Sequence, residues 1–499
     1  MTVGQERTDD RSVHTLSTTK KVALAAGPIL GIACYLLLPA DLAAPARAAA
    51  GVGVLMATWW MTEAVPIPVT ALLPLVLFPT LGVLETDAAA APYANPVIFL
   101  VLGGVLLGLA TQRWNLHRRI ALRTVLLMGT RPSRLVFGLM VASAFISMWV
   151  SNTATAVIMV PIGLSILQLV SSLDERAATG KLGSAMLLGV AYAVTIGSMA
   201  TPIGQPPMAL MKAYLAATHG FDLGFGQWML VGVPFGAVLL GVAWLVLTKL
   251  VFRSELDEIP GGRGLIRSEL DKLGPLSGPE RSVLLVFAAA ACCWVVVPTL
   301  AELPLLASWT WLGSISDTVV AMAAAIALFL IPAGRRHNGP LLEWSATSEV
   351  PWGVLLLFGG GLSLSAAFSE TGFSEWLGQQ VAGVPVPPVV LLLIAVVTVI
   401  LLTELTSNTA TAAAFFPIMG SVAVGVGMDP LLMTIAVAMA VSCAFMLPVA
   451  TPSNAVAFAT GELPIKHMIR AGVLINLAGM ALIMLTMVTL VPLVFGVSL

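Results

Sequence analysis

A pentapeptide of small polar residues, Ser-Asn-Thr-Ala-Thr, occurs twice in the chain, at residues 151–155 and 407–411. Each copy lies in the middle of a long apolar stretch. A shift of 256 residues superimposes the two copies and also carries Gly103-Gly104 onto Gly359-Gly360. Small polar side chains at matched places in two halves of an apolar chain indicate a binding site where two repeats meet.

The residue types of the pentapeptide favour the start of a helix. Ser, Asn and Thr cap helix N-termini through a side-chain oxygen, so the motif could serve only as a cap. One cap needs one such residue, however, and the other donors at a buried helix start are free to hold an anion. Two such helix starts that face each other would suit a ligand with two anionic ends.

Basic side chains are absent from the neighbourhood of both pentapeptides. All five histidines fall in loops or at the ends of apolar runs, at His14, His117, His219, His337 and His467. A buried dianion would therefore need bound cations beside it, because burying unpaired charge is costly. Hydroxyl, amide and unwound backbone carbonyl oxygens suit Na⁺. The pattern predicts cation-coupled transport of an anion.

The composition places the chain among membrane proteins. Of its 499 residues, 58% are apolar and 10% charged, and the mean hydropathy is +0.97. We expect an all-α polytopic membrane protein with about eleven transmembrane helices. The chain contains no His-Glu-x-x-His, Gly-x-Ser-x-Gly or Walker A motif, which argues against an enzyme. Neither an organic cofactor nor a nucleic-acid partner is expected.

Apolar runs long enough to cross a bilayer predict the individual spans. They lie at 22–40, 48–62, 66–84, 95–112, 185–217, 228–252, 281–299, 317–333, 351–368, 431–460 and 469–497. Two further segments, at about 135–170 and 389–425, are too long for one crossing and carry a pentapeptide at the centre. We interpret both as re-entrant hairpins, each built from two half-helices. Two full spans joined by a tight turn are the alternative.

The distribution of basic residues favours the hairpins. With hairpins, 22 of the 24 Lys and Arg residues fall on the same side as the N-terminus, leaving Arg47 and Lys212 on the other. By the positive-inside rule, that side is the cytoplasm. Full spans would move the basic loop 253–281 outside. Five ordinary spans separate the two Gly-Gly pairs, so the second half is inverted and the hairpin tips approach each other from opposite sides.

This topology divides the chain into five parts. They are a cytoplasmic tail (1–21), a first transmembrane helix (22–47), a first inverted repeat with the cytoplasmic-side hairpin (48–252), a cytoplasmic linker (253–280) and a second inverted repeat with the outer-side hairpin (281–499).

Two other spans contain prolines at corresponding places. Residues 200–207 read Ala-Thr-Pro-Ile-Gly-Gln-Pro-Pro, and residues 450–454 read Ala-Thr-Pro-Ser-Asn. One proline alone would indicate a kink, but paired interruptions that each follow a hairpin predict two broken helices with free carbonyls.

Glu404, four residues before Asn408, is a candidate proton or cation site, or a structural carboxylate paired with a hydroxyl or a backbone N–H.

Four segments resemble the divalent anion/sodium symporter (DASS) family. They are Thr-Glu-Ala-Val-Pro-Ile-Pro-Val-Thr-Ala-Leu-Leu-Pro (62–74), Ser-Met-Trp-Val-Ser-Asn-Thr-Ala-Thr (147–155), Thr-Glu-Leu-Thr-Ser-Asn-Thr (403–409) and Phe-Met-Leu-Pro-Val-Ala-Thr-Pro-Ser-Asn (445–454). The resemblance runs from about residue 48 to the end. It implies a homodimer in the cell membrane whose protomers each have a scaffold part and a transport part that moves like an elevator. It also implies dicarboxylates such as succinate, malate or fumarate as substrates, carried with Na⁺.

The resemblance also implies the ligands of each site by position. A first Na⁺ site would use Ser147, Ser151, Asn152 and Gly204, and a second Thr403, Thr406, Asn408 and Ala450. The substrate would contact Ser151, Asn152, Thr153, Gln205, Ser407, Asn408, Thr409, Thr451 and Pro452.

The chain departs from the family pattern at both breaks. Gly204-Gln-Pro-Pro-Met208 stands where the family has Gly-(Thr/Ser)-Pro-Pro-Asn, and Pro452-Ser-Asn454 stands where it has Pro-Pro-Asn. The large Gln205 side chain would narrow the pocket or contact the ligand. An exchanger of the same architecture that needs no Na⁺, or a transporter of sulfate or a tricarboxylate, remains an alternative.

Overall fold

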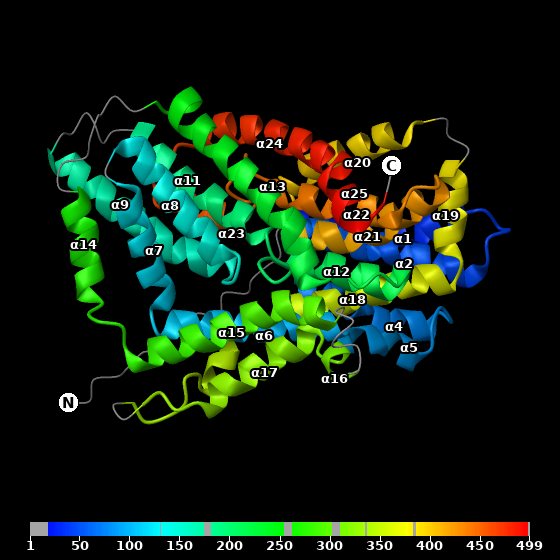
Figure 1. Cartoon of the computed structure of the whole chain (residues 1–499). Helices are drawn as coiled ribbons and strands as arrows, with labels where there is room; N and C mark the ends of the chain where they lie inside the picture. The colour runs from blue at the N-terminus through cyan, green and yellow to red at the C-terminus, as the bar shows by residue number, and fades with distance from the viewer. Residues whose placement is uncertain are drawn as a thin grey trace, which may run out of the picture.

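The computed structural model describes residues 18–129, 131–173, 181–253, 262–301, 310–334, 337–382 and 386–497. Within these ranges every regular element is a helix, apart from one isolated β-bridge between Pro332 and Pro340, so the predicted all-α class is confirmed (Figure 1). Seven of the described helices are long and apolar enough to cross a membrane. The predicted tail 1–21 and linker 253–280 lie partly outside the described residues.

Six helical elements lie within residues 18–94. They are α1 (Thr18–Leu37), α2 (Ala44–Thr62), α3 (Ile67–Thr70), α4 (Leu73–Thr80), α5 (Thr86–Ala90) and the 3₁₀ turn η1 (Ala91–Ala94). The predicted first transmembrane helix at 22–47 is too long, because α1 ends at Leu37. The predicted span at 66–84 is broken, because Pro74 lacks an N–H for the carbonyl of Thr70 and separates α3 from α4.

The two halves then repeat one order of helices. The first half contains α6 (Pro96–Arg113), α7 (Leu116–Met128), α8 (Pro132–Ser147), α9 (Asn152–Leu173), α11 (Lys181–Ser198), α12 (Pro206–His219) and α13 (Phe225–Leu245), followed by the π-helical turn η2 (Val246–Val251). The second contains α18 (Trp352–Glu370), α19 (Phe373–Ala382), α20 (Pro388–Thr403), α21 (Asn408–Gly425), α22 (Pro430–Ser442), α23 (Pro452–Phe458) and α24 (Ile465–Val488), followed by α25 (Leu490–Phe495).

The shift of 256 residues also relates helix boundaries. It carries both ends of α8 onto both ends of α20, and the first residue of α9 onto the first residue of α21. Each hairpin starts with a proline in the first helical position, where no N–H partner is needed, and its second arm starts with the Asn of the pentapeptide. The local sequence therefore fixes the geometry of both hairpins independently.

The arms of each hairpin pack against each other and reverse the chain within four residues, 148–151 and 404–407. The first arms, α8 and α20, each have 16 residues. A 16-residue helix is about 24 Å long, which is shorter than the ~30 Å hydrocarbon core of a bilayer. The first hairpin lies toward the left of Figure 1 and the second toward the right, so they approach the middle from opposite ends.

The core of the molecule is formed by the two helices that were predicted to be broken. All residues of α11 from Leu182 to Ser198 are buried, and so are all residues of α22 from Leu431 to Ser442. Residues 199–205 and 443–451 then leave the helix before α12 and α23 begin. Helices that are apolar on every face belong in a core, and both predicted breaks are confirmed.

The two repeated Gly-Gly pairs allow close helix packing. A Cβ at Gly103 would lie 2.7 Å from the carbonyl oxygen of Ala321 in α17 (Asp317–Leu330), and one at Gly360 would lie 2.4 Å from the carbonyl oxygen of Ala71. No side chain fits at such separations. Glycine therefore lets α6 and α18 each approach a neighbouring backbone, as is common in membrane helix pairs.

Three amphipathic helices were missed by the search for apolar runs. They are α7, inside the predicted loop 112–134, α19, between two predicted spans, and α14 (Gly262–Lys272), inside the predicted linker. A search for long apolar runs does not detect helices with one charged face. The remaining elements between the halves are α15 (Gly278–Ala301), α16 (Thr310–Gly313), α17 and the 3₁₀ helix η4 (Trp344–Glu349).

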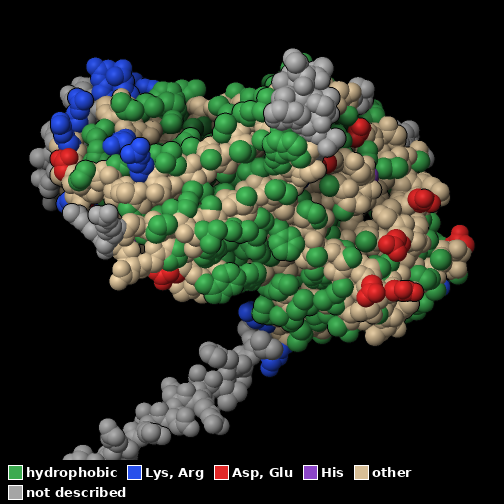
Figure 2. Space-filling model, turned by 60° about the horizontal axis from the view of Figure 1, so that its bottom comes forward, with side chains coloured by type: hydrophobic (Ala, Val, Ile, Leu, Met, Phe, Trp, Pro, Cys, Tyr) green, Lys and Arg blue, Asp and Glu red, His purple; other side chains and the backbone are tan. Residues whose placement is uncertain are grey.

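Charged side chains separate along the long axis of the molecule. Figure 2 shows Lys and Arg gathered mainly at one end, and Asp and Glu mainly at the other. At the acidic end, a cavity of about 670 Å³ is lined by Glu85, Asp87 and Glu370, among others. The band between the two ends is largely apolar, as expected for a protein that lies across a bilayer.

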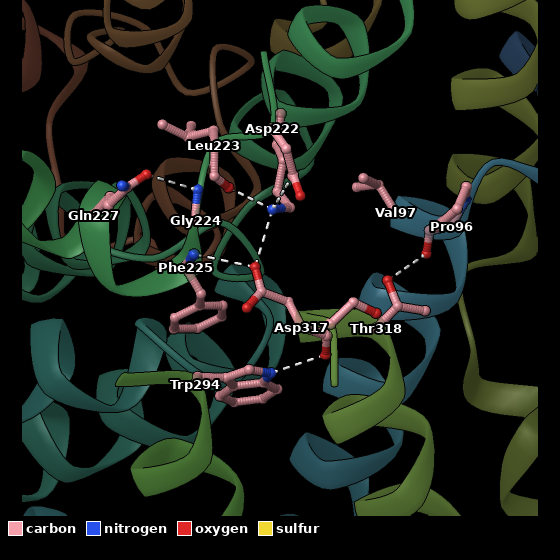
Figure 3. A network of polar contacts seen from close by, with 12 residues as sticks. Pro96, Val97, Asp222, Leu223, Gly224, Phe225, Gln227, Trp294, Asp317 and Thr318 are labelled. Carbon is pink, nitrogen blue, oxygen red and sulfur yellow. Dashed lines mark hydrogen bonds and ion pairs between the residues drawn. The ribbon is translucent and has the colours of Figure 1, made fainter. Parts of the chain in front are cut away.

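An ionic network around the buried Lys212 side chain joins four helices (Figure 3). The ammonium group of Lys212, a residue in the middle of α12, donates to Asp317 at 2.9 Å, to the exposed Asp222 at 3.1 Å, and also to the carbonyl oxygen of Leu223. Asp317 accepts a further bond from the Phe225 N–H, while its own carbonyl oxygen accepts from the Trp294 indole. The network ties α12 and α13 to α15 and α17.

Candidate functional site

The tip of the first hairpin is anchored to α11 and to the break that follows it. Ser147, the last residue of α8, is buried and its hydroxyl donates to the carbonyl oxygen of Val194 in α11. The carbonyl oxygen of Met148 accepts a bond from the hydroxyl of Thr201, which lies in the break. Two candidate regions that are about fifty residues apart in sequence therefore meet at this tip.

The second hairpin tip repeats this arrangement. Thr403, the counterpart of Ser147, is buried, and its hydroxyl lies 3.0 Å from the carbonyl oxygen of Val441 in α22. The same hydroxyl lies 2.6 Å from Oδ1 of Asn408. Because a hydroxyl has one proton, it can donate to only one of these oxygens at a time.

Both pentapeptides do cap their helices, with one residue each. The Ala154 N–H donates to the Ser151 hydroxyl at 3.4 Å, and the Ala410 N–H donates to the Ser407 hydroxyl at 3.5 Å. The capping interpretation thus accounts for the serines. It leaves the Asn and Thr side chains of both pentapeptides unexplained.

The Asn and Thr side chains differ between the two tips. At the second tip, the Asn408 oxygen has Thr403 as a partner, and the Thr411 hydroxyl bonds the Thr406 hydroxyl at 2.8 Å. At the first tip, Oδ1 of Asn152 and Oγ1 of Thr155 are buried without a hydrogen-bond partner. The counterpart of Thr406 is Val150, which offers no hydroxyl.

Buried oxygens without a partner are rare because each one loses its bond to water. These two oxygens belong to the pentapeptide that also contains Ser151, and Ser147 and Ser151 were predicted to bind a cation. An amide oxygen, hydroxyls and backbone carbonyls form a donor set that fits Na⁺. The residues present at the first tip therefore fit the predicted ion.

Each break ends in a short helix with the same start. Gln205 and Thr451 occupy the N-cap positions of α12 and α23 with extended backbone angles, φ −149° and −142°, and each is followed by a proline. The Thr451 hydroxyl caps α23 by accepting from the Asn454 N–H at 3.1 Å. The Gln205 amide instead donates to the Ser442 hydroxyl at 2.6 Å, which joins the two halves.

The candidate residues are brought together crosswise. The second arm of the first hairpin, α9, packs against α23, and the second arm of the second hairpin, α21, packs against α12. A hydrogen bond between the hydroxyls of Thr195 and Ser453, 3.0 Å apart, adds a second link between the halves. The second arm of each hairpin therefore packs against the short helix after the break of the other half, while each tip is bonded to the break of its own half.

Exposure differs across the candidate substrate residues. Ser151, Thr153 and Pro452 are exposed, Asn152 and the whole of 407–409 are partly buried, and Gln205 and Thr451 are buried. Ser151 and Thr153 of the first tip are thus exposed, whereas Oδ1 of Asn152 is buried. The roles of all these residues as ligands stay predictions.

Sequence reasoning missed two polar residues that link these elements. They are Thr195 and Ser442, and both are buried. Each is an isolated hydroxyl residue within or beside an apolar helix that was already singled out. A search of those helices for single Ser and Thr residues would have found them.

Comparison with known proteins identifies the family. The family model described as the sodium:sulfate symporter transmembrane region matches residues 17–497. The chain belongs to this family, the divalent anion/sodium symporters. Two similar relatives are named sodium-dependent dicarboxylate transporter SdcS. The one from Staphylococcus saprophyticus is 40% identical over 484 residues, covering 96% of this chain and 92% of the relative. The one from Staphylococcus aureus MRSA252 is 41% identical over 489 residues, covering 97% of this chain and 93% of the relative.

Solved structures of other transporters share the fold of this family member. The YdaH transporter of Alcanivorax borkumensis aligns with a TM-score of 0.54 at 17% identity, covering 96% of this chain and 97% of YdaH. MtrF of Neisseria gonorrhoeae aligns with a TM-score of 0.55 at 15% identity, covering 82% of this chain and 84% of MtrF. The apolar helices, the family model and the named relatives together identify an integral membrane protein.

Proposed function

We propose that the protein is a secondary transporter that moves C4-dicarboxylates across the membrane together with Na⁺, by an elevator-type movement of its hairpin-bearing part. The observation that supports this proposal is the crosswise packing of the second arm of each hairpin against the short helix that follows the break of the other half. Their polar groups are hydroxyls, amides and backbone groups, so a bound dianion would be neutralised by ions that travel with it. The names of the relatives point to the same substrate and ion.

The proposed ligands follow the two tips. The first Na⁺ site comprises Ser147, Ser151, Asn152 and Gly204, and the second comprises Thr403, Thr406, Asn408 and Ala450. The carboxylates of the substrate would contact the pentapeptides and the starts of α12 and α23, where helix N-termini favour negative charge.

The proposed setting is a homodimer in the plasma membrane with a cytoplasmic N-terminus. The basic end in Figure 2 would face the cytoplasm, consistent with the distribution of Lys and Arg. Residues 48–252 and 281–499 would form the two inverted repeats. Within each protomer, the hairpins and broken helices would form the moving part.

Uptake of labelled succinate into proteoliposomes tests this function. We expect uptake that depends on external Na⁺, falls to background when choline replaces Na⁺, and is reduced by unlabelled malate or fumarate. Equal uptake in choline would contradict coupling, and a requirement for internal dicarboxylate would identify an exchanger. Inhibition of uptake by sulfate or citrate, without inhibition by malate, would indicate that the substrate is sulfate or a tricarboxylate and not a C4-dicarboxylate.

Substitution of Gly204 by alanine should impair the same uptake. A Cβ at this position would lie 2.3 Å from the backbone carbonyl oxygen of Ser198, so the break must shift to accommodate it. Displacement of a binding group by about 1 Å can reduce rates by roughly a hundredfold. We expect at least a tenfold loss, whereas Gly241→Ala in α13, where a Cβ meets no atom within 4 Å, should leave uptake unchanged. Equal uptake by Gly204→Ala and Gly241→Ala would show that Gly204 is not part of the binding site.

A further inference from the structure

Glu404 stands at the tip of the second hairpin and reaches into the break of α22. Its Oε1 accepts hydrogen bonds from the N–H groups of Phe445 at 2.7 Å and Met446 at 3.0 Å. Its Oε2 accepts from Met446 and from Leu447, both at 3.1 Å. A single carboxylate therefore takes up three successive backbone N–H groups that the unwound helix has left free.

The side chain of Asn476 in α24 completes this arrangement. Its amide nitrogen donates to Oε1 of Glu404 at 2.6 Å. Both carboxylate oxygens thus act only as acceptors, which is the arrangement of an ionised carboxylate. Glu404 is 1% exposed, and all four of these donors are uncharged. Successive backbone N–H groups form an anion-binding nest, so here the protein holds its own buried negative charge.

The carbonyl side of the same break is fixed by a different residue. The Asn454 side-chain amide donates to the carbonyl oxygens of Ala444 and Leu447, at 3.3 and 3.0 Å. With the N–H groups of this segment held by Glu404 and two of its carbonyls held by Asn454, the unwound backbone has one defined shape. Ala450, a proposed ligand of the second Na⁺ site, lies at the end of this segment.

The first half has no such charge. The counterpart of Glu404 under the shift of 256 residues is Met148, and the first tip is anchored to its break through the neutral hydroxyl of Thr201. The buried carboxylate therefore distinguishes the second tip from the first. It directly follows Thr403 in the chain, and Thr406 and Asn408 are two and four residues further on.

We propose that Glu404 is a positioning residue for the second Na⁺ site, and that its fixed negative charge sets the Na⁺ affinity of that site. This inference rests on the proposed function. The carboxylate holds the backbone of 445–447 in one conformation and would stabilise a cation bound at the second site, because opposite charges attract strongly where water is excluded. It thereby makes the second site more dependent on electrostatics than the first.

Three variants separate the charge from the shape. Glu404→Gln removes the charge and retains the size, Glu404→Asp retains the charge on a shorter side chain, and Asn476→Leu removes a neutral hydrogen bond from the same carboxylate. For each purified variant, the Na⁺ concentration that gives half-maximal thermal stabilisation would be measured in choline-balanced buffer, together with the half-saturating Na⁺ and succinate concentrations for uptake. Amide hydrogen exchange of 443–451 without Na⁺ gives a readout that is independent of transport.

We expect Glu404→Gln to raise the half-saturating Na⁺ concentration roughly tenfold or more, with less than about a threefold change for succinate at saturating Na⁺. Asn476→Leu and Glu404→Asp should shift the Na⁺ requirement by less than about threefold, since both keep the charge. Every Glu404 variant should accelerate exchange of the 445–447 amides.

Equal Na⁺ shifts in Glu404→Asp and Glu404→Gln, or in Asn476→Leu and Glu404→Gln, would overturn the role of the charge. If Glu404→Gln does not fold, the two charge-retaining variants decide, because a shift of about tenfold or more in the Na⁺ requirement of Glu404→Asp or Asn476→Leu would overturn the role of the charge. A wild-type protein without Na⁺-dependent uptake or Na⁺-dependent stabilisation would instead reject the proposed function. Unchanged exchange at 445–447 in the Glu404 variants would reject the positioning role by itself.

Discussion

Replacement of Asn152 or Asn408 by alanine is expected to reduce Na⁺-dependent dicarboxylate uptake to the background of empty proteoliposomes. Each Asn begins the second arm of a hairpin and is proposed to contact both the substrate and one Na⁺ ion. Alanine removes the amide oxygen that would bind the ion and the amide N–H group that would bind a carboxylate. No neighbouring side chain can replace both functions at once.

The two variants should differ in stability when Na⁺ is absent. The Asn152 amide oxygen is buried without a hydrogen-bond partner, so Asn152→Ala breaks no hydrogen bond of this oxygen. We expect this variant to change the free energy of unfolding by less than about 1 kcal/mol. Asn408→Ala removes an acceptor of the Thr403 hydroxyl, but that hydroxyl can still donate to the carbonyl oxygen of Val441. Both variants should therefore fold, and Asn152→Ala should also lose the stabilisation that Na⁺ gives to the wild type.

Ser165→Ala provides a matched control in the same helix as Asn152. Ser165 is exposed and its hydroxyl donates only to the carbonyl oxygen of Pro161 one turn earlier, at 2.9 Å. This variant should transport at the wild-type rate. Uptake by Asn152→Ala or Asn408→Ala that matches Ser165→Ala would show that the pentapeptides do not bind the transported solute.

The sequence predicted the local geometry of this fold well, because that geometry depends on short motifs. Proline in the first position of α8 and α20, and Asn at the start of α9 and α21, define both hairpins wherever they lie in space. The positions of the two breaks also followed from prolines at corresponding places in the two halves. These features need no knowledge of tertiary contacts.

The shift of 256 residues does not align the residues of one broken helix with those of the other. From the hairpins to the breaks the offset between halves falls from 256 to 246 residues, which pairs Gln205 with Thr451. The offset changes mainly because corresponding helices differ in length. α9 has 22 residues and α21 has 18, while α11 has 18 and α22 has 13.

The hydrogen-bond donors to Glu404 could not be predicted from the sequence. The sequence left open whether this carboxylate binds a proton or a cation, or pairs structurally. The structure places it against backbone N–H groups more than forty residues away in the chain and against Asn476. Backbone donors carry no signal in a sequence, so only the folded chain reveals such a pairing.

The second large effect is expected at the ion pair between Arg119 in α7 and Glu280 at the start of α15. Both side chains are buried, 4% and 5% exposed, and they form two parallel bonds of 2.9 and 3.1 Å. Arg119 also donates to the carbonyl oxygens of Leu273 and Gly274. Loss of one member leaves a buried charge without its partner, so Arg119→Leu should lower the free energy of unfolding by about 3–5 kcal/mol.

Thermal unfolding in detergent measures this effect, and a double-mutant cycle isolates the pair. Because the double variant leaves neither charge unpaired, Arg119→Leu/Glu280→Leu should lose less stability than the two single variants added together. The pair between Arg113 and Glu343 is the matched control, since its side chains are 36% and 47% exposed. Surface pairs contribute little, so Arg113→Leu should cost less than about 1 kcal/mol. Additive effects at Arg119 and Glu280 would mean that the amphipathic helix α7, which the sequence did not predict, is held to α15 by contacts other than this ion pair.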